Sequence, residues 1–307
     1  MKNEKIAVIG NGIHGKRIQK ILKNKNKNFF VFTSKDLNNK KKIIQLHNAK
    51  IIFIISPNKT HANYLKQLNS NSYIFCEKPP VTNKKDLKYI SKLNYRKIYF
   101  NFNKRFSFFV ENIKKIKKKY ELGELIYGNM IISKGLALKN DYKNSWRSNI
   151  KKNKKGVFET VSIHEIDLVN YLFNFKKINQ IKLKNFSKIG TSFDTSFTRI
   201  ELKNDAYVDI VSTYFSSLFS KYIFLFKNGV IEFDKNNFIL RYPTKSFNKK
   251  NMFKEPKIVF QKKLIKDNDY NISLIKSVDY FLKIDENKKN FLKKDFDVAI
   301  HTNQLIL

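Results

Sequence analysis

The feature that most constrains the fold is a short apolar run near the start of the sequence that breaks into glycines and reopens as a helical pattern. Ile6–Ile9 is too short for a helix and rich in branched side chains, which predicts a strand buried on both faces. From Ile13 onward apolar residues recur at helical spacing, at Ile18, Ile21 and Leu22. The stretch therefore predicts a strand, a glycine turn and a helix.

Three glycines follow this strand in the spacing G-x-G-x-x-G, and each has a physical role if a dinucleotide lies against the turn. Gly10 permits the tight turn, Gly12 lets the backbone approach a pyrophosphate, and Gly15 lets the helix pack closely on the strand. The start of the helix presents free N–H groups and a positive dipole end to the phosphates. We expect contacts to a dinucleotide from Gly10, Gly12, Ile13, His14 and Gly15. The alternative is a glycine-rich connection without a ligand.

The second predicted strand, Phe29 to Thr33, ends where the adenosine ribose lies in a dinucleotide-binding fold. An acidic residue at this point selects NAD by binding the ribose 2′-hydroxyl. Here Thr33, Ser34 and Lys35 offer hydroxyl groups and a cation, and the first carboxylate is that of Asp36. The pattern favours the 2′-phosphate of NADP, with the alternative that Asp36 reaches the ribose.

Length and composition limit the class of protein. The 307 residues suffice for two domains, and an apolar content of 42% indicates a globular chain. Because no apolar run is long enough to cross a bilayer and no signal-peptide pattern precedes the first strand, we expect a cytoplasmic protein without membrane contact. Cys76 is the only cysteine, which excludes an intrachain disulfide. The histidines lack metal-ligand spacing, so we predict no metal.

The formal charge of +37 is the compositional feature that most suggests an anionic partner such as nucleic acid. Only six of the 62 basic residues are arginine, whereas nucleic-acid surfaces depend on the bidentate guanidinium group. The lysines are spread along the whole chain among Asn, Ile and Phe, which A/T-rich codons also encode. Biased codon usage accounts for this charge, and we expect no nucleic-acid partner.

Strands and helical stretches alternate through the first third of the chain. Further strands are predicted at Ile51 to Ile55, Tyr73 to Cys76 and Ile98 to Phe102. This alternation predicts an α/β fold, with a doubly wound parallel sheet of the Rossmann type over residues 1–119. Ligands bind at the carboxyl ends of such strands, where the polar stretches 56–61, 77–80 and 103–106 fall.

The second half of the sequence has the pattern of a sheet-rich domain. A lysine-rich amphipathic helix, Phe109 to Tyr120, leads into it. Strands are expected at 125–133, 178–186, 193–202, 207–215, 221–226, 230–233 and 238–242, followed by helices at 272–282 and 296–307. We predict an α+β domain over residues 120–307 with a large, mostly antiparallel open sheet. Its free face, rich in Phe and Tyr, is expected to form a homodimer or homotetramer contact.

Five motifs occur in a consistent order along nearly the whole chain. They are Gly10-x-Gly12-x-x-Gly15, Ser56-Pro57-Asn58-x-x-His61, Cys76-Glu77-Lys78-Pro79, the stretch from Asn101 to Phe106, and Gly156 through His164-x-x-Asp167. Together they resemble the glucose-fructose oxidoreductase, inositol dehydrogenase and rhizopine-catabolism (Gfo/Idh/MocA) family of NAD(P)-dependent oxidoreductases. The resemblance implies that the cofactor is bound by Ser56, Pro57, Asn58, His61, Glu77 and Lys78, together with Thr33, Ser34, Lys35 and the glycine loop.

The resemblance also implies a catalytic role for Lys78 and His164. Removing a hydride from a carbinol carbon leaves an oxygen that must lose its proton, and a nearby ammonium group stabilises the developing alkoxide. On a helix, Thr160, His164 and Asp167 share one face, and a histidine there can exchange the hydroxyl proton near neutral pH. We therefore expect Lys78, His164, Asp167 and Thr160 to form the catalytic group, with Asp167 orienting or binding the substrate.

The chain departs from the family pattern around the helix of His164. Thr160 stands where the family usually has an aspartate, Glu159 comes one place earlier, and Lys154 and Lys155 replace two of the three usual glycines. Threonine cannot take up a proton near neutral pH. Three alternatives follow: a shorter proton relay, a helix that begins differently and brings Glu159 in, or lost activity.

The motifs predict an NAD(P)-dependent oxidoreductase with a lean to NADP. The resemblance alone implies that it acts on a sugar or sugar derivative in surface-polysaccharide synthesis. Substrate contacts are expected from Lys78, Arg105, Trp146, Arg147 and His164. Two alternatives remain open. One is a cofactor-binding family member without turnover, suggested by Thr160, and the other is a basic nucleic-acid binder, which the scarcity of arginine disfavours.

Overall fold

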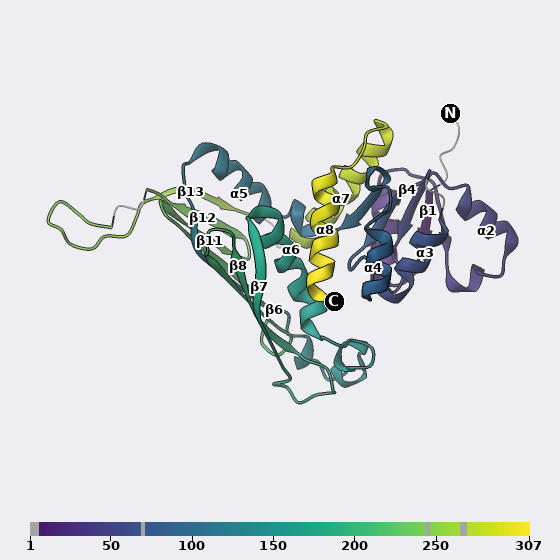
Figure 1. Ribbon diagram of the computed structural model, residues 1–307, viewed down its shortest axis with the longest axis horizontal. Coiled ribbons are helices and arrows are strands. Elements are labelled where there is room, and N and C mark those ends of the chain that lie inside the picture. Colours follow the sequence, from purple (N-terminus) through teal and green to yellow (C-terminus); the bar gives the residue numbers. More distant parts are fainter. Residues whose placement is uncertain (1–5, 69–70, 244–245, 265–268) are drawn as a thin grey trace. The chain divides into compact units, whose positions relative to one another are not determined.

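The structure is a computed structural model that describes residues 6–68, 71–243, 246–264 and 269–307. The described residues fall into two compact units. The first contains the chain up to Asn103 together with Leu274–Leu307, and the second contains Lys104–Ser273. Figure 1 shows a parallel sheet in the first unit and a larger, mostly antiparallel sheet in the second. The predicted fold class, a Rossmann-type sheet followed by an α+β domain, is confirmed.

The parallel sheet of the first unit is built from short apolar strands. Within the described ranges its order is β2-β1-β3-β4-β5, and every neighbouring pair is parallel. The strands are β1 (Ile6–Ile9), β2 (Phe29–Phe32), β3 (Ile51–Ile54), β4 (Tyr73–Glu77) and β5 (Ile98–Asn101). Because the carboxyl ends of parallel strands lie at one edge, the segments that follow these strands form a single polar edge of the sheet.

Six helices of the described chain contribute to the first unit. They are α1 (Ile13–Asn24), α2 (Lys40–His47), α3 (His61–Gln67), α4 (Lys84–Ile90), α7 (Asp269–Glu286, from Leu274 onward) and α8 (Lys293–Ile306). In α1 the buried side is formed by Gly15, Ile18 and Leu22, as helical spacing requires. Ile13 is 79% exposed, so it lies outside this buried stripe. Helix α4 lies beside α3 and α8.

The two compact units differ from the predicted division at residue 119. Helix α5 (Phe108–Lys119) belongs to the second unit, where the ring of Phe109 packs 5.1 Å from that of Tyr222. The last two helices return to the first unit. There Phe281 of α7 packs against Phe53 and Phe75 of the parallel sheet, with ring centroids 5.2 and 5.4 Å apart. Aromatic packing between residues distant in sequence therefore sets the division.

The large sheet of the second unit has the order β13-β12-β11-β10-β6-β9-β8-β7 in the part of the chain that is described. Neighbouring strands are antiparallel except β6 and β9, which are parallel. The strands are β6 (Leu125–Ser133), β7 (Phe175–Lys184), β8 (Thr195–Leu202), β9 (Tyr207–Thr213), β10 (Phe219–Phe226), β11 (Gly229–Asp234), β12 (Asn237–Arg241) and β13 (Ile258–Lys263).

One face of this sheet is covered and the other carries exposed side chains. Tyr222, Phe224 and Phe226 alternate along β10 on the buried face. Phe109 of α5 stacks on Phe224, and Phe173, which follows helix α6 (Ile163–Leu172), packs on the same ring. Side chains exposed on the large sheet include Ile181, Phe197, Tyr207 and Leu225. The predicted apolar free face is thus partly polar, since it also carries an Arg199–Asp209 ion pair.

Two elements lack a counterpart in the sequence-based prediction. Helix α2 has eight residues and begins with three lysines, so it shows little periodicity. Strand β13 is an edge strand whose side chains are mostly exposed, so no apolar alternation marks it. Among the described residues, no helix combines the length and the apolar character needed to cross a membrane.

Candidate functional site

The glycine loop between β1 and α1 requires glycine at two of its three positions for internal reasons. Gly10 has φ +111°, and a β-carbon there would lie 2.5 Å from the carbonyl oxygen of Ile55. A β-carbon on Gly15 would lie 2.5 Å from the carbonyl oxygen of Gly10. Any other residue at either position would force the backbone apart, so these two glycines fix the turn and the close approach of helix to strand.

Gly12 differs, because a β-carbon there would meet no atom of the described chain within 4 Å. Its φ of −71° is accessible to any residue. Gly12 precedes the first turn of α1 and has no side-chain cap, so the first amide groups of the helix lack a side-chain acceptor there. An open N-cap position without a side-chain cap is what a pyrophosphate at a helix N-terminus requires. The loop therefore fits the dinucleotide predicted from its sequence.

At the end of β2 the Asp36 carboxylate is engaged within the protein. It accepts hydrogen bonds from the backbone N–H of Thr33 at 2.8 Å and from the Thr33 hydroxyl at 2.9 Å. The Lys42 ammonium group donates to its other oxygen at 2.7 Å. The hydrogen bonds from Lys42 and Thr33 hold the pKa of Asp36 below its ordinary value. Ser34 and Lys35 are exposed beside this carboxylate.

The residues that follow β3, Ser56 to His61, contribute contacts inside the protein that hold two turns together. His61 was expected to bind the cofactor, but its side chain is fully buried. Its Nδ1 lies 2.9 Å from the carbonyl oxygen of Pro79, and its Nε2 lies 2.9 Å from that of Ser56. Burial lowers the pKa of His61 although both carbonyl groups oppose the shift. His61 therefore connects the end of β3 to the Lys78–Pro79 turn. Both ring nitrogens of His61 thus face backbone carbonyl groups of the protein, and its predicted contact with a cofactor stays a prediction.

Pro57 and Asn58 remain at the surface of the same turn. Pro57 is exposed and Asn58 is half-buried. The Ser56 hydroxyl lies 2.6 Å from that of Thr60, which in turn donates to the carbonyl oxygen of Pro57 at 2.8 Å. The turn after β3 thus has a fixed shape, and its outer residues lie at the carboxyl edge of the sheet.

The Glu77-Lys78-Pro79 element follows β4, and Lys78 is half-buried with a cis peptide bond to Pro79. The segment beyond it is held by Asn303 of α8. Asn303 accepts a hydrogen bond from the backbone N–H of Val81 at 2.8 Å and donates to its carbonyl oxygen at 3.1 Å. Asn303 is fully buried. The sequence analysis did not identify it, because a single asparagine 222 residues after Val81 is part of no recognisable motif.

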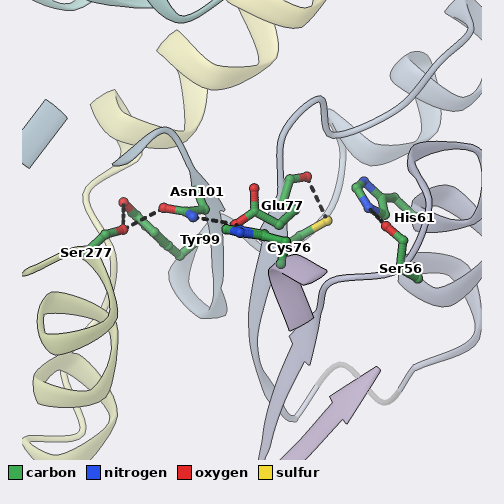
Figure 2. A network of polar contacts seen from close by, with 8 residues as sticks. Ser56, His61, Cys76, Glu77, Tyr99, Asn101 and Ser277 are labelled. Carbon is green, nitrogen blue, oxygen red and sulfur yellow. Dashed lines mark hydrogen bonds and ion pairs between the residues drawn. The ribbon is translucent and has the colours of Figure 1, made fainter. Parts of the chain in front are cut away.

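Glu77 is the centre of a buried polar network, part of which Figure 2 shows. Its Oε1 lies 2.7 Å from Nε2 of His14 and accepts a hydrogen bond from Nδ2 of Asn101 at 2.5 Å. The Oδ1 of Asn101 accepts from the Ser277 hydroxyl at 2.6 Å, and that hydroxyl lies 2.9 Å from the hydroxyl of Tyr99. The network joins the glycine loop, two strand ends and α7 within the first unit.

In the second unit Arg105 and Asp167 pair with each other. The Arg105 guanidinium donates to both oxygens of Asp167, at 2.8 and 2.6 Å, and the two side chains are 4% and 1% exposed. Arg105 was expected to bind substrate and Asp167 to take part in catalysis. Their buried mutual pairing supports the start of α6 from within this unit, and a contact of either residue with substrate stays a prediction.

A second buried charge beside α6 is neutralised in the same way. Glu165 is fully buried and accepts a hydrogen bond from the Lys104 ammonium group, which also contacts the hydroxyl of Tyr222 at 3.2 Å. Burial opposes the charged form of Lys104, but Glu165 raises its pKa above the ordinary value. Burial, partly offset by Lys104, raises the pKa of Tyr222 to about 12. These residues therefore anchor α6.

The helix of His164 begins differently from a regular α-helix. Phe158–Ser162 forms a π-helical turn directly before α6, and His164 is the second residue of α6, half-buried. The Thr160 hydroxyl donates to the carbonyl oxygen of Gly156 at 2.9 Å and lies 2.6 Å from the Tyr214 hydroxyl. The predicted alternative was an altered start that brings Glu159 into the proton relay. Here the Glu159 carboxylate accepts a hydrogen bond from the backbone N–H of Lys155 at 3.2 Å, and its part in a relay stays a prediction.

Tyr214 brings several predicted residues together and was missed by the sequence analysis. Its side chain is 1% exposed, and burial raises the pKa of its hydroxyl. Thr160 and Arg147 both hydrogen-bond with it, and Glu159 lies close enough to interact electrostatically. Burial raises the pKa of Glu159 as well. One tyrosine among 15 has no sequence signal, whereas the structure gives this one a central position.

Trp146 and Arg147 are adjacent in space as well as in sequence. The Arg147 guanidinium lies 4.4 Å from the ring of Trp146, and Trp146 is 41% exposed. An exposed aromatic ring backed by a cation suits a sugar, which presents apolar ring faces and hydroxyl groups. Lys78 belongs to the first unit and His164, Trp146 and Arg147 to the second. In the described ranges, no group of three or more His, Cys, Asp or Glu side chains could hold a metal ion.

Similarity to known proteins agrees with this arrangement. Residues 114–239 match the model of the Gfo/Idh/MocA oxidoreductase family, C-terminal alpha/beta domain. Inositol 2-dehydrogenase of Salmonella typhimurium strain LT2 is 25% identical over 152 residues, which are 47% of this chain and 41% of that protein. Glucose-6-phosphate 3-dehydrogenase of Bacillus subtilis strain 168 is 26% identical over 175 residues, 53% of this chain and 50% of that protein. The matches thus span half or less of the length of these curated relatives.

The whole fold has counterparts among solved structures. Levoglucosan dehydrogenase in complex with NADH has a TM-score of 0.78 at 16% sequence identity, over 99% of this chain and 96% of that one. This likeness in fold covers both sheets, whereas the family model matches residues 114–239 of the second unit. Those residues are therefore similar to the C-terminal domain of the glucose-fructose oxidoreductase, inositol dehydrogenase and rhizopine-catabolism family.

Proposed function

We propose that the chain is an NAD(P)-dependent oxidoreductase that transfers a hydride between nicotinamide and a carbinol or carbonyl carbon of a sugar or sugar derivative. The observation that carries this proposal is Gly12, the N-cap residue of α1, where a β-carbon would meet no atom of the described chain within 4 Å. Contacts within the fold explain glycine at positions 10 and 15, whereas at position 12 the approach of a pyrophosphate supplies the reason. The similarity of residues 114–239 to the Gfo/Idh/MocA C-terminal domain supports the class of reaction.

The residues divide the chemistry between them. When bound, the nicotinamide ring accepts the hydride that leaves the carbinol carbon. The Lys78 ammonium group stabilises the charge that develops on the substrate oxygen, and His164 takes up the hydroxyl proton. In the reverse direction His164 returns that proton. Trp146 and Arg147 contact the sugar ring and its hydroxyl groups, which orients the carbon that reacts.

Cofactor preference is proposed from the end of β2. The Asp36 carboxylate is already bonded to Thr33 and Lys42, so it has little capacity left for a ribose 2′-hydroxyl. Exposed Ser34 and Lys35 remain to receive a 2′-phosphate, which favours NADPH. Comparing kcat/KM for NADPH and NADH tests this preference. A clear preference for NADH contradicts it.

Substrate class is tested by a screen with two separate readouts. Fluorescence titration with NADH and NADPH measures cofactor binding, and turnover is then assayed with myo-inositol, glucose 6-phosphate, levoglucosan and nucleotide-linked sugars, the last as precursors of surface polysaccharide. Turnover of any of these with a bound cofactor supports the proposal. The absence of dinucleotide binding contradicts it.

A second candidate function, cofactor binding without turnover, is favoured by Thr160. Its hydroxyl is bonded to Tyr214 and cannot serve as a base near neutral pH. Thr160→Asp distinguishes the two. If the wild type binds cofactor and turns over no sugar while the variant gains activity, the non-catalytic alternative holds.

The oligomeric state is also a proposal. Exposed Phe197, Tyr207 and Leu225 on the large sheet support a homodimer or homotetramer contact through that sheet. Light scattering that finds only monomer at micromolar concentration contradicts it.

A further inference from the structure

His14 is a titratable residue inside the loop that the proposed cofactor would occupy. It stands between Gly12 and Gly15, in the first turn of α1. Its Nε2 lies 2.7 Å from Oε1 of Glu77, and the two side chains are 29% and 12% exposed. A protonated histidine at the start of a helix is opposed by the helix dipole. A specific partner is therefore needed to hold its charge, and Glu77 is placed to be that partner.

Hydrogen bonds from Asn101, and through it from Ser277, fix the position of the Glu77 carboxylate. Asn101 donates to the same carboxylate oxygen that faces His14, and Ser277 of α7 donates to Asn101. Asn101 and Ser277, whose contact Figure 2 shows, are 1% and 0% exposed, so this support is buried. Because both Asn101 and His14 meet one oxygen, rotation of the carboxylate away from His14 would break two interactions. The geometry therefore holds Glu77 toward the glycine loop.

The charged groups that face His14 come from both elements packed around it. They are Glu77 and Lys78 after β4, and Arg17 on α1. Burial, Arg17 and Lys78 act to lower the pKa of His14, but the Glu77 carboxylate outweighs them, and the pKa is raised. Burial acts to raise the pKa of Glu77, but His14, Asn101 and Lys78 lower it. The pair is thus an imidazolium beside a carboxylate below the pKa of His14.

We propose that His14 is a positioning residue for the dinucleotide: paired with Glu77, it adds a titratable positive charge to the glycine loop and ties that loop to the strand end that bears Lys78. The inference rests on the proposed function, because it requires a dinucleotide in the loop. Its consequence is that cofactor affinity depends on the protonation of His14.

The sign of this dependence follows from linkage. A pyrophosphate is negative, so it binds the protein with a protonated His14 more tightly, and affinity falls as pH rises through the pKa of His14. If the cofactor raises that pKa by about one unit, affinity falls about tenfold from the acid to the alkaline limit. The relation is reciprocal, so bound cofactor must raise the pKa of His14 by the same amount.

The test measures the dissociation constant of NADH by fluorescence from about pH 6.5 to about pH 9.5, a range that spans the titration of a histidine with a raised pKa. The proteins are the wild type, His14→Gln, His14→Arg and, as a matched control, His47→Gln, since His47 is an exposed histidine of α2. We expect affinity to fall about tenfold with pH in the wild type and in the control. His14→Gln should bind weakly at every pH, and His14→Arg should bind well at every pH.

Two outcomes overturn the proposal. One is a wild-type affinity that does not change with pH, and the other is the same pH dependence in His14→Gln as in the wild type. If the wild type binds NADPH and not NADH, the same titrations are made with NADPH, and failure to bind either dinucleotide at any pH instead removes the proposed function. If His14→Gln does not fold, histidine NMR of the wild type decides, because a His14 pKa that is unchanged by NADH also contradicts the role.

Discussion

The guanidinium of Arg105 grips both carboxylate oxygens of Asp167, at 2.8 and 2.6 Å, inside the second unit. Arg199 and Asp209 form the same bidentate contact, with both distances 2.8 Å, but Arg199 is 50% exposed. The chain thus contains the same bidentate arginine–aspartate pair once in the interior and once at the surface. Removing one partner of a buried pair leaves a charge without compensation, whereas water replaces the lost partner at the surface.

Asp167→Asn should therefore lower the free energy of unfolding by about 3–5 kcal/mol. The matched control Asp209→Asn should lower it by about 1 kcal/mol or less. Urea unfolding of both variants measures the two values. Equal losses would mean that the Arg105–Asp167 pair does not anchor α6 as its burial indicates.

The same added methyl group is expected to lower NADH affinity at Gly12 and to lower the stability of the protein at Gly15. Gly12→Ala meets no atom within 4 Å, so its stability should change by less than about 1 kcal/mol, while NADH affinity should fall at least tenfold. Gly15→Ala places its β-carbon 2.5 Å from the carbonyl oxygen of Gly10 and should destabilise the protein by about 1–3 kcal/mol. Thermal unfolding and NADH titration of both variants separate the effects. Unchanged NADH affinity in Gly12→Ala would remove the main support for a cofactor in this loop.

Lys78→Ala and His164→Ala should each reduce turnover about 10²- to 10⁴-fold, because each removes a group that handles charge or a proton on the substrate oxygen. Cofactor dissociation constants should change less than about threefold, a small effect on the scale of binding energies. Lys59→Ala and His47→Ala alter exposed residues and are the controls. Wild-type turnover in both active-site variants would refute the roles given to them.

Stability should also depend on pH through His14 and Glu77. The raised pKa of His14 means that its contribution is fully present below the ordinary histidine pKa of about 6.5 and is lost as pH rises through the folded-state value. The lowered pKa of Glu77 means that its contribution is present above its ordinary value and is lost as pH falls through the folded-state value. The stability difference between wild type and His14→Gln should therefore be largest near pH 6 and shrink toward alkaline pH. A difference that grows above neutrality would contradict this assignment.

The architecture was accessible from sequence because its determinants are local and periodic. The run Ile6–Ile9 and the spacing of Gly10, Gly12 and Gly15 predict a strand, turn and helix without any knowledge of the remaining chain. Strand β6 was predicted at 125–133, the bounds that the structure has. Alternating burial along such strands is a property of the backbone itself.

The buried residues that hold the candidate site in place could not be predicted from the sequence, because they are single polar residues in distant segments. Asn101, Ser277 and Asn303 carry no spacing signal, yet each is buried and holds part of the Glu77–Val81 segment or its partner. The pairing of Arg105 with Asp167 was missed for the same reason, because 62 residues separate them. Sequence patterns identified the candidate site residues, and only tertiary packing reveals the buried polar residues that support them.

The first unit is discontinuous, since its sheet comes from the chain before Lys104 and helices α7 and α8 come after the second unit. During synthesis the ribosome therefore makes the whole second unit before Phe281, Ser277 and Asn303 exist to complete the parallel sheet. The nascent strands β3 and β4 must wait with their aromatic side chains uncovered for some 170 residues of translation, the length of the intervening unit. The parallel sheet can therefore acquire its Phe281 contacts only after the second unit has been synthesised.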